Sequence, residues 1–239
     1  VFFIHDITLP HLYHFFAIIP PMKPFTHLHV HSHFSLLNAL PKIPELIEAA
    51  KKDGMKALAL TDNCNTYGAI EFYEKCKKAE IKPILGIDAY VASRTRHDKE
   101  GRIDMSRSRL VLLAKNIEGY RNIIKLVTKA HLEGFYYKPR IDKELMSLYN
   151  KDLICISPSF SGELSQALKT ANIEKAQELL AYYRKTYGEE NFFMEITHHP
   201  EIEGQAEHEK SIIDFAQKNN VPLVASHDVY YINKEDRDA

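Results

Sequence analysis

Short aliphatic runs alternate with longer segments of helical periodicity along most of this chain, and this alternation constrains its fold more than any other feature. Runs such as "ALAL" and "LICI" are apolar at every position, which is typical of strands buried on both faces of a parallel sheet. Segments such as "IPELIEAAKKDG" place their apolar side chains on one face, and Gly54 is a typical helix stop. Repeated strand–helix units of this kind predict an α/β fold.

Seven strands are expected, and amphipathic segments lie between them. The expected strands cover residues 25–31, 56–61, 83–92, 109–115, 152–157, 192–197 and 222–226. The clearest helical segments cover 43–54, 67–80, 119–134, 173–188 and 203–220. No glycine-rich phosphate loop follows the first strand, which argues against an open, doubly wound nucleotide-binding sheet. We therefore expect a seven-stranded (β/α)7 barrel with a parallel sheet, closed or nearly closed.

Chain length and composition indicate one globular domain. The 239 residues are 45% apolar, which is enough for a core that needs no disulfide or metal to hold it together. Three cysteines without a CxxC spacing are typical of a reduced, cytoplasmic protein. The net charge of −1 gives the whole chain no general attraction to nucleic acid, so any DNA contact must be local.

The first 21 residues differ from the rest of the chain. They are apolar, but they contain three histidines, Asp6 and three prolines, and no basic residue precedes Lys23. A membrane span and a signal peptide are both disfavoured by this composition. We expect residues 1–21 to be a non-native or disordered upstream extension and residues 22–239 to form the domain, with Met22 as the start.

Histidines and carboxylates recur where the expected strands end. Four histidines occupy every second position of "FTHLHVHSHFS": His27, His29, His31 and His33. Alternation along a strand places them on one face, with Leu28 and Val30 on the other. Side chains at the carboxyl ends of barrel strands meet at one mouth, where Asp62, Asp88 and Asp228 would join them. Because imidazoles and carboxylates together suit divalent metals, a metal-derived site is favoured over a merely hydrogen-bonded strand edge.

Longer segments resemble a known family, the PHP (polymerase and histidinol phosphatase) domain, in the version that begins the alpha subunit of bacterial DNA polymerase III, the C-family replicative polymerase. The resemblance runs from about Lys23 to the last residue. It rests on "HLHVHSHFSLLNAL", "ALALTDNCNTYGAIEFYEKCKKAEIKPILGIDAYVA", "LVLLAKNIEGYRNIIKLVTKAHLEGFYYKPRID" and "VPLVASHDVYYINKEDRDA". The segments "GAIEFY", "IKPILG", "LLAKN" and "GYRNIIKL" are similar to the polymerase version rather than to the free-standing phosphatase. The resemblance implies a distorted barrel of the PHP type, which in its complete form binds up to three divalent metals and hydrolyses phosphoesters.

The ligand set that the resemblance implies is incomplete in this chain. His29, His31, Asp88 and Asp228 match metal ligands of the family. Five positions depart from its pattern: Asn38, Asn63, Arg109, Ser159 and Tyr230. An amide, a guanidinium and a neutral phenol are poor ligands for zinc or manganese. We therefore expect no metal or one weakly bound divalent ion (Zn or Mn), and we assign no catalytic residue. Asp62 and His199 are candidate supporting residues.

Three features stay open at this stage. Arg109 either projects its guanidinium among Asp62, Asp88 and Asp228, where it replaces the charge of a metal, or points to solvent. Residues 136–138, "YYK", are a DNA-facing patch or, as base rates favour, a packed aromatic loop. The charged stretch 93–108 is interpreted as a solvated surface loop rather than a nucleic-acid arm.

The function that these features favour is a structural and partner-docking domain of a DNA polymerase III alpha subunit. The resemblance implies the rest of the alpha subunit and the proofreading exonuclease subunit as partners, with DNA bound through the holoenzyme and no membrane contact. Nucleotidyl transfer itself would reside in an absent palm domain that holds magnesium, so we expect the chain to be a truncated piece. The alternative is an active metal-dependent phosphoesterase or 3′–5′ exonuclease that uses His29, His31, Asp88 and Asp228. A free-standing histidinol phosphatase is disfavoured because such an enzyme needs the intact ligand set.

Overall fold

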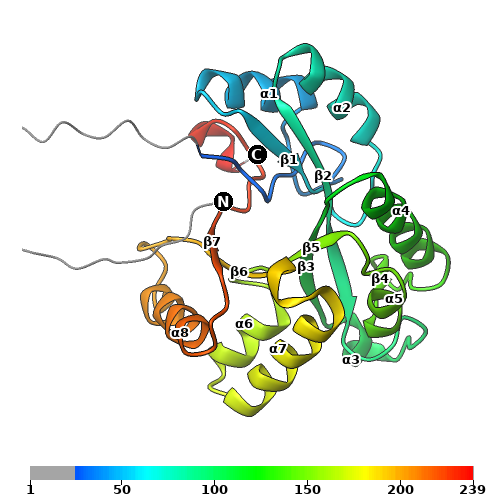
Figure 1. The fold of residues 1–239 in the computed structure, drawn as a ribbon, viewed down its shortest axis with the longest axis vertical. Helices are drawn as coiled ribbons and strands as arrows, with labels where there is room; N and C mark the ends of the chain where they lie inside the picture. Colours follow the sequence, from blue (N-terminus) through cyan, green and yellow to red (C-terminus); the bar gives the residue numbers. More distant parts are fainter. Residues whose placement is uncertain (1–24, 239) are drawn as a thin grey trace, which may run out of the picture.

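A curled sheet forms a partly open barrel, and the helices lie around its outer side (Figure 1). The computed structural model describes residues 25–238, so the expectation for residues 1–21 lies outside the described range. The strands are β1 (Ala57–Leu60), β2 (Lys82–Ala92), β3 (Arg107–Ala114), β4 (Arg140–Ile141), β5 (Leu153–Ser157), β6 (Phe192–Ile196) and β7 (Leu223–Ala225). Their hydrogen-bonded order is β1-β2-β3-β5-β6-β7, and β4 pairs with β2. The prediction of a distorted seven-stranded α/β barrel is confirmed, although the barrel is partly open.

The helices include the five that the periodicity predicts and three shorter ones that it does not. They are α1 (Ile43–Lys52), α2 (Ala69–Lys78), α3 (Gly101–Met105), α4 (Ile117–Leu132), α5 (Lys143–Leu148), α6 (Glu163–Lys169), α7 (Ile173–Tyr187) and α8 (Gln205–Lys218), with short 3₁₀ turns η1 (Glu189–Asn191) and η2 (Lys234–Asp238). The five amphipathic segments become α1, α2, α4, α7 and α8. No helix among residues 25–238 is long and apolar enough to cross a membrane.

Strand β3 is antiparallel to both of its neighbours, β2 and β5, so the prediction of a wholly parallel sheet is wrong. The segment between β2 and β3 carries only the five-residue α3, so no long crossover helix returns the chain to the other end of the sheet. Because β3 runs antiparallel to β2, its first residues lie at the same rim of the barrel as the last residues of β2. Arg109, near the start of β3, is therefore located at the barrel mouth.

The first expected strand, 25–31, is reduced to an isolated bridge between Val30 and Val229. Hydrogen bonds from Val229 N to His29 O (3.1 Å) and from His31 N to Val229 O (3.0 Å) fix this segment on one side, and Thr61 N to Val30 O (2.8 Å) fixes it on the other. The segment thus spans the opening between β1 and β7, which do not pair with each other.

Strict alternation does not hold along this first segment. Leu28 packs with Ala59 and Val111, whereas Val30 packs with Ile43 in a separate cluster beneath α1 and α2. Leu28 and Val30 were expected on the same face of a strand, but they pack into different hydrophobic clusters. A segment that makes only a bridge is free to bend between residues in a way that a regular strand is not.

The charged stretch 93–108 is exposed along much of its length but is firmly tied to the domain. Arg140 is completely buried and donates hydrogen bonds to the carbonyl oxygens of Gly134 (3.0 Å), Asp104 (2.8 Å), Arg96 (3.1 Å) and Asp98 (2.9 Å). One guanidinium therefore gathers two loops at the end of β2, because its donors reach several carbonyls at once.

Candidate metal centre at the barrel mouth

Four donor residues from three distant parts of the chain meet at the barrel mouth. They are His29 and His31 in the bridging segment, Asp88 in β2 and Asp228 just after β7. One ligand atom from each lies within 4.8 Å of all the others. His29, His31 and Asp88 are buried, and the Asp228 side chain is 27% exposed. The mouth is therefore a compact donor cluster with one side open to solvent.

Asp88 is the centre of this cluster. Its Oδ2 lies 3.2 Å from Nε2 of His29 and 3.2 Å from Nε2 of His31. Asp228 Oδ1 lies 3.4 Å from His29 Nε2 and 3.3 Å from His31 Nδ1. A fully buried carboxylate such as Asp88 requires a compensating positive charge, because transfer of an ion out of water is costly.

Arg109 supplies that charge. Its Nη2 is in direct contact with Asp88 Oδ2, and its Nη1 donates to Asp228 Oδ2 at 3.3 Å. The side chain is 17% exposed, so it turns into the mouth rather than to solvent. Of the two orientations left open for Arg109, the structure has the inward one.

Asn63 and Tyr230 also contact the groups around Arg109. Asn63 Oδ1 accepts a hydrogen bond from Arg109 Nη2 at 3.2 Å. Tyr230 donates its hydroxyl to Asp228 Oδ2 at 3.2 Å and stacks on His31, with ring centroids 4.3 Å apart and planes 5° apart. Burial raises the pKa of Tyr230, and the neighbouring Asp228 adds to this, so the phenol remains a hydrogen-bond donor. The replacements thus form one hydrogen-bonded set.

Both ring nitrogens of His31 have polar neighbours. Nδ1 lies 3.3 Å from the carbonyl oxygen of Val229, and Nε2 lies 3.2 Å from Asp88 Oδ2 and 3.2 Å from Arg109 Nη2. Burial lowers the pKa of His31 to about 3, and the neighbouring His29 and Arg109 lower it further than Asp228 raises it. His31 is therefore a neutral imidazole.

Glu195 belongs to the site although sequence reasoning did not select it. This β6 residue is 2% exposed, and its Oε2 accepts from Nδ1 of His29 at 3.0 Å. A carboxylate behind a histidine fixes the ring so that its other nitrogen points to the site. The available signal was a charged residue inside the apolar run "FFMEI", where burial without a partner is costly.

The remaining candidates lie outside this cluster. Asn38 is exposed and its amide contacts Leu36 O. Ser159 is hydrogen-bonded to the Thr197 hydroxyl, and His199 lies 3.0 Å from Glu201 through its Nδ1. In the described part of the chain, none of these three forms a hydrogen bond or an ion pair with the four donors.

Asp62 supports the site from behind. It accepts from the Ser32 backbone (2.8 Å), the Ser32 hydroxyl (2.8 Å) and the Ser35 hydroxyl (2.6 Å), and it therefore anchors the turn that follows His31. Burial raises the pKa of Asp62, and these hydrogen bonds oppose the shift. Its oxygens are occupied by serine donors, so its contribution is to position His31 rather than to offer a ligand atom.

The donor chemistry fits one divalent ion. His29, His31, Asp88 and Asp228 are suitable ligand types, and Asp88 Oδ1 is buried without a hydrogen-bond partner. Three carboxylates, those of Asp88, Asp228 and Glu195, stand against the single guanidinium of Arg109, so the charges of these four groups sum to −2. Asn63, Arg109 and Tyr230, which surround the donors, present an amide, a guanidinium and a phenol, and these are poor ligands for further ions.

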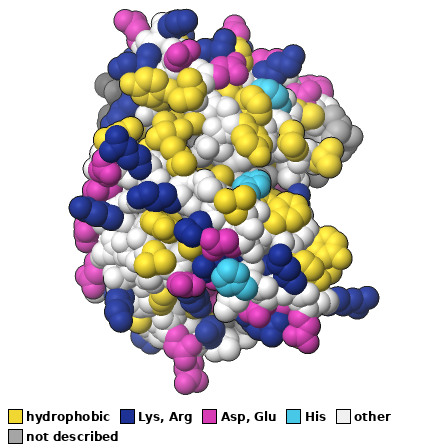
Figure 2. Space-filling model, turned by 90° about the vertical axis from the view of Figure 1, so that its right-hand side faces the viewer, with side chains coloured by type: hydrophobic (Ala, Val, Ile, Leu, Met, Phe, Trp, Pro, Cys, Tyr) yellow, Lys and Arg dark blue, Asp and Glu magenta, His cyan; other side chains and the backbone are white. Residues whose placement is uncertain are grey.

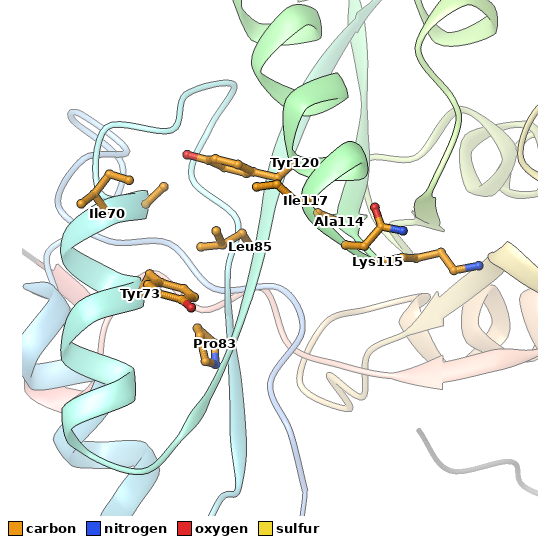
Figure 3. Close-up of a pocket in the computed structure, with 10 residues that line it drawn as sticks. Ile70, Tyr73, Pro83, Leu85, Ala114, Lys115, Ile117 and Tyr120 are labelled. Carbon is orange, nitrogen blue, oxygen red and sulfur yellow. The ribbon is translucent and has the colours of Figure 1, made fainter.

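An apolar groove lies elsewhere on the molecule, between α2 and the start of α4 (Figure 3). Its volume is about 440 Å³, and its lining holds no carboxylate or imidazole. Ile70, Tyr73 and Ile117 are exposed there, and Figure 2 shows hydrophobic side chains gathered on the upper half of the corresponding face. The groove lacks the carboxylates and imidazoles that bind a metal, so the mouth is the candidate metal centre.

Comparison with known proteins gives consistent matches. The family model described as the PHP domain matches residues 27–199. The DNA polymerase III alpha subunit of Borreliella burgdorferi is 40% identical over 216 residues, and the subunits of Treponema pallidum and Thermus aquaticus are 39% and 38% identical over 213 and 216 residues. These alignments cover 89–90% of this chain but only 18–19% of the relatives, so the chain spans about a fifth of their length.

Solved structures share the fold at low identity. A protein of the metal-dependent phosphoesterase type from Bifidobacterium adolescentis superimposes with a TM-score of 0.60 at 11% identity, covering 88% of this chain and 89% of that one. An amidohydrolase from Chromobacterium violaceum gives 0.55 at 12% identity, covering 87% and 88%. At such identities the likeness concerns the fold alone.

Proposed function

Since the chain belongs to the PHP domain family, we propose that it is the PHP domain of a DNA polymerase III alpha subunit and that it acts there as a scaffold rather than as a phosphoesterase. The identity of 35–40% to alpha subunits from several bacteria supports the parent protein. The residues at the barrel mouth support the role as a scaffold. The parent protein and the scaffold role therefore rest on different observations, and separate experiments test them.

The contact of Arg109 with Asp88 and Asp228 carries the proposal of a scaffold. A guanidinium neutralises two ligand carboxylates with fixed geometry, and it has no lone pair to offer an ion. A second ion of the kind that clamps a phosphate would have to displace this side chain. The mouth therefore keeps the electrostatic balance of a metal centre while it lacks the means to assemble one with several ions.

One ion remains compatible with the donors. His29, His31, Asp88 and Asp228 would hold it, with Glu195 orienting His29. A bound divalent ion supplies Lewis acidity and lowers the pKa of a coordinated water. The residues of this chain contribute ligand orientation and charge balance.

A hydrolysis assay tests the proposal that the site has no phosphoesterase activity. The 239-residue chain is incubated with bis(p-nitrophenyl) phosphate in the presence of Mn²⁺ or Zn²⁺ and compared with Asp228→Asn, a substitution at the partly exposed ligand. We expect both proteins to release p-nitrophenol at the same background rate. Metal-dependent turnover that Asp228→Asn abolishes would establish the alternative, an active phosphoesterase or exonuclease.

We propose the rest of the alpha subunit and the proofreading exonuclease subunit as partners, on the similarity to polymerase subunits. Size-exclusion chromatography of the chain mixed with the exonuclease subunit of the same organism tests the second partner. Co-elution at an increased mass is the expected result. Separate elution at micromolar concentrations would remove the exonuclease from the proposal.

A further inference from the structure

A tight turn after α4 presents an exposed tyrosine at its apex. Tyr136 and Lys138 face each other in an antiparallel bridge, with Tyr136 N donating to Lys138 O at 3.1 Å, so Tyr137 alone occupies the tip. Tyr137 has φ = 59°, a left-handed conformation that a residue with a bulky side chain rarely adopts. The buried Arg140 holds the base of the turn through Gly134 O. The fold therefore keeps this ring outward at a conformational cost.

Aromatic rings gather around this apex. Tyr137 is 63% exposed and Phe135 is 51% exposed, and the ring of Tyr136 meets that of Tyr137 edge to face with centroids 4.8 Å apart. The expectation that residues 136–138 form a packed loop is therefore wrong for Tyr137, because a packed loop would cover its ring. Exposed, rigidly held aromatic faces are stacking surfaces for planar ligands.

Basic side chains line the floor beside these rings. Tyr90, which lies opposite Arg109 on β3 and Arg140 on β4, carries the Arg107 guanidinium 5.3 Å and the Lys138 ammonium 6.0 Å from its ring centroid. Within residues 25–238, neither of these cations forms an ion pair with a carboxylate. Both charges are therefore available to an anionic ligand.

We propose that Phe135, Tyr137, Lys138 and Arg107 form a binding surface for single-stranded nucleic acid at the rim of the barrel mouth. Such a ligand alternates planar bases with phosphates, which matches exposed rings next to unpaired cations. A protein-docking surface of similar aromatic content would more often shield or pair its charges at the centre. The surface lies outside the metal centre, and the inference stands whether or not the proposed parent protein is right.

Fluorescence anisotropy tests this surface directly. The 239-residue chain is titrated onto a fluorescein-labelled oligodeoxythymidine of about 12 nucleotides at low salt. Tyr137→Gly removes the ring, and glycine adopts the observed φ without strain, so the fold is retained. We expect the affinity to fall about 5- to 50-fold for Tyr137→Gly and to change less than about twofold for Tyr137→Phe.

The cations have a separate readout. Lys138→Gln and Arg107→Gln are each expected to reduce the slope of log affinity against log salt concentration by about 0.7 to 1. Tyr73→Leu, an exposed tyrosine in the apolar groove, is the matched control and should bind like the unaltered chain. Equal affinity of Tyr137→Gly and the unaltered chain, or no binding at low salt, would overturn the proposal. The second result would favour a protein as the occupant.

Discussion

At the scale of single residues, Arg109 decides the chemistry of the mouth. Asp88 is completely buried, and its Oδ2 faces two imidazole nitrogens and the guanidinium of Arg109. Without a cation, a carboxylate in this position would be strongly destabilised. The positive charge beside Asp88 comes from the side chain of Arg109.

Replacement of Arg109 by methionine should destabilise the domain. Arg109→Met leaves Asp88 buried without its main counter-charge, and we expect the free energy of unfolding to fall by about 3 to 5 kcal/mol, as measured by urea denaturation. Arg107→Met, two residues away in the same strand and without a carboxylate partner, is the control and should cost less than about 1 kcal/mol. Equal effects of the two substitutions would contradict the role given to Arg109.

A double substitution isolates the electrostatic part. Asp88→Asn combined with Arg109→Met removes both charges, and much of the loss caused by Arg109→Met should be recovered. Recovery of less than about 0.5 kcal/mol in the double-mutant cycle would mean that Arg109 stabilises the mouth by packing alone.

The sequence brought the donor residues into view in two steps. The spacing of His29 and His31 and the carboxylates near other expected strand ends indicated a cluster, and the resemblance to the PHP domain then singled out His29, His31, Asp88 and Asp228 as the ligands. Glu195 was missed because it lies inside a strand rather than at its end, and its role depends on the neighbouring segment across the mouth. The stacking of Tyr230 on His31 likewise depends on a long-range contact that one-dimensional patterns do not encode.

At the scale of elements, the buried Arg140 organises the rim. Its guanidinium donates to four carbonyl oxygens, three in the stretch 93–108 and one at Gly134, and it therefore ties these two segments together. Lysine has one donor group and cannot reach all four acceptors. We expect Arg140→Lys to lower the free energy of unfolding by about 2 to 4 kcal/mol, because buried carbonyls lose their partners. A cost below about 1 kcal/mol in urea denaturation would contradict this role.

Acid should loosen the stretch 93–108 before the rest of the domain. Hydrogen bonds from Lys129 and Arg96 lower the pKa of Glu133 to about 2, and Arg94 lowers that of Asp104. A carboxylate with a depressed pKa stabilises the fold above the usual value of 4.5, and this contribution is lost as the pH falls toward about 2. Hydrogen-exchange protection of residues 93–108 should therefore decrease between about pH 5 and pH 3.

Glu133→Gln provides the comparison for the acid effect. This substitution removes the titrating group, so part of the pH dependence should disappear while protection at neutral pH decreases. Protection that falls equally in α4 and in residues 93–108 would indicate general acid unfolding instead of a local event.

Helices were predictable where they carry a long apolar stripe, and strands where an apolar run fills the sheet. The direction of β3 was not predictable, because an apolar strand reads the same in both directions. The two residues of β4 are too few to show any period. The prediction of a regular first strand was wrong for another reason. The hydrogen bonds of this segment to Val229 and to β1 are long-range, and they form an isolated bridge instead of a regular ladder.

At the scale of the whole molecule, the sheet supports a polar mouth lined by metal-ligand residues and, outside it, apolar and aromatic surfaces. The mouth gathers donors from the bridging segment, β2, β6 and the residues after β7, and Arg109 from β3 balances their charge. The apolar groove holds none of these donors, and the aromatic apex at the rim uses other side chains. The barrel fold thus holds the four donors and their hydrogen-bonded neighbours in one compact site.

The metal content of the purified chain tests this account most directly. The protein is dialysed against Mn²⁺ or Zn²⁺ and the bound metal is measured by elemental analysis against protein concentration. The account predicts at most one divalent ion per chain, because Arg109, Asn63 and Tyr230 provide hydrogen bonds where further ligands would be needed. Two or three tightly bound ions per chain would contradict it.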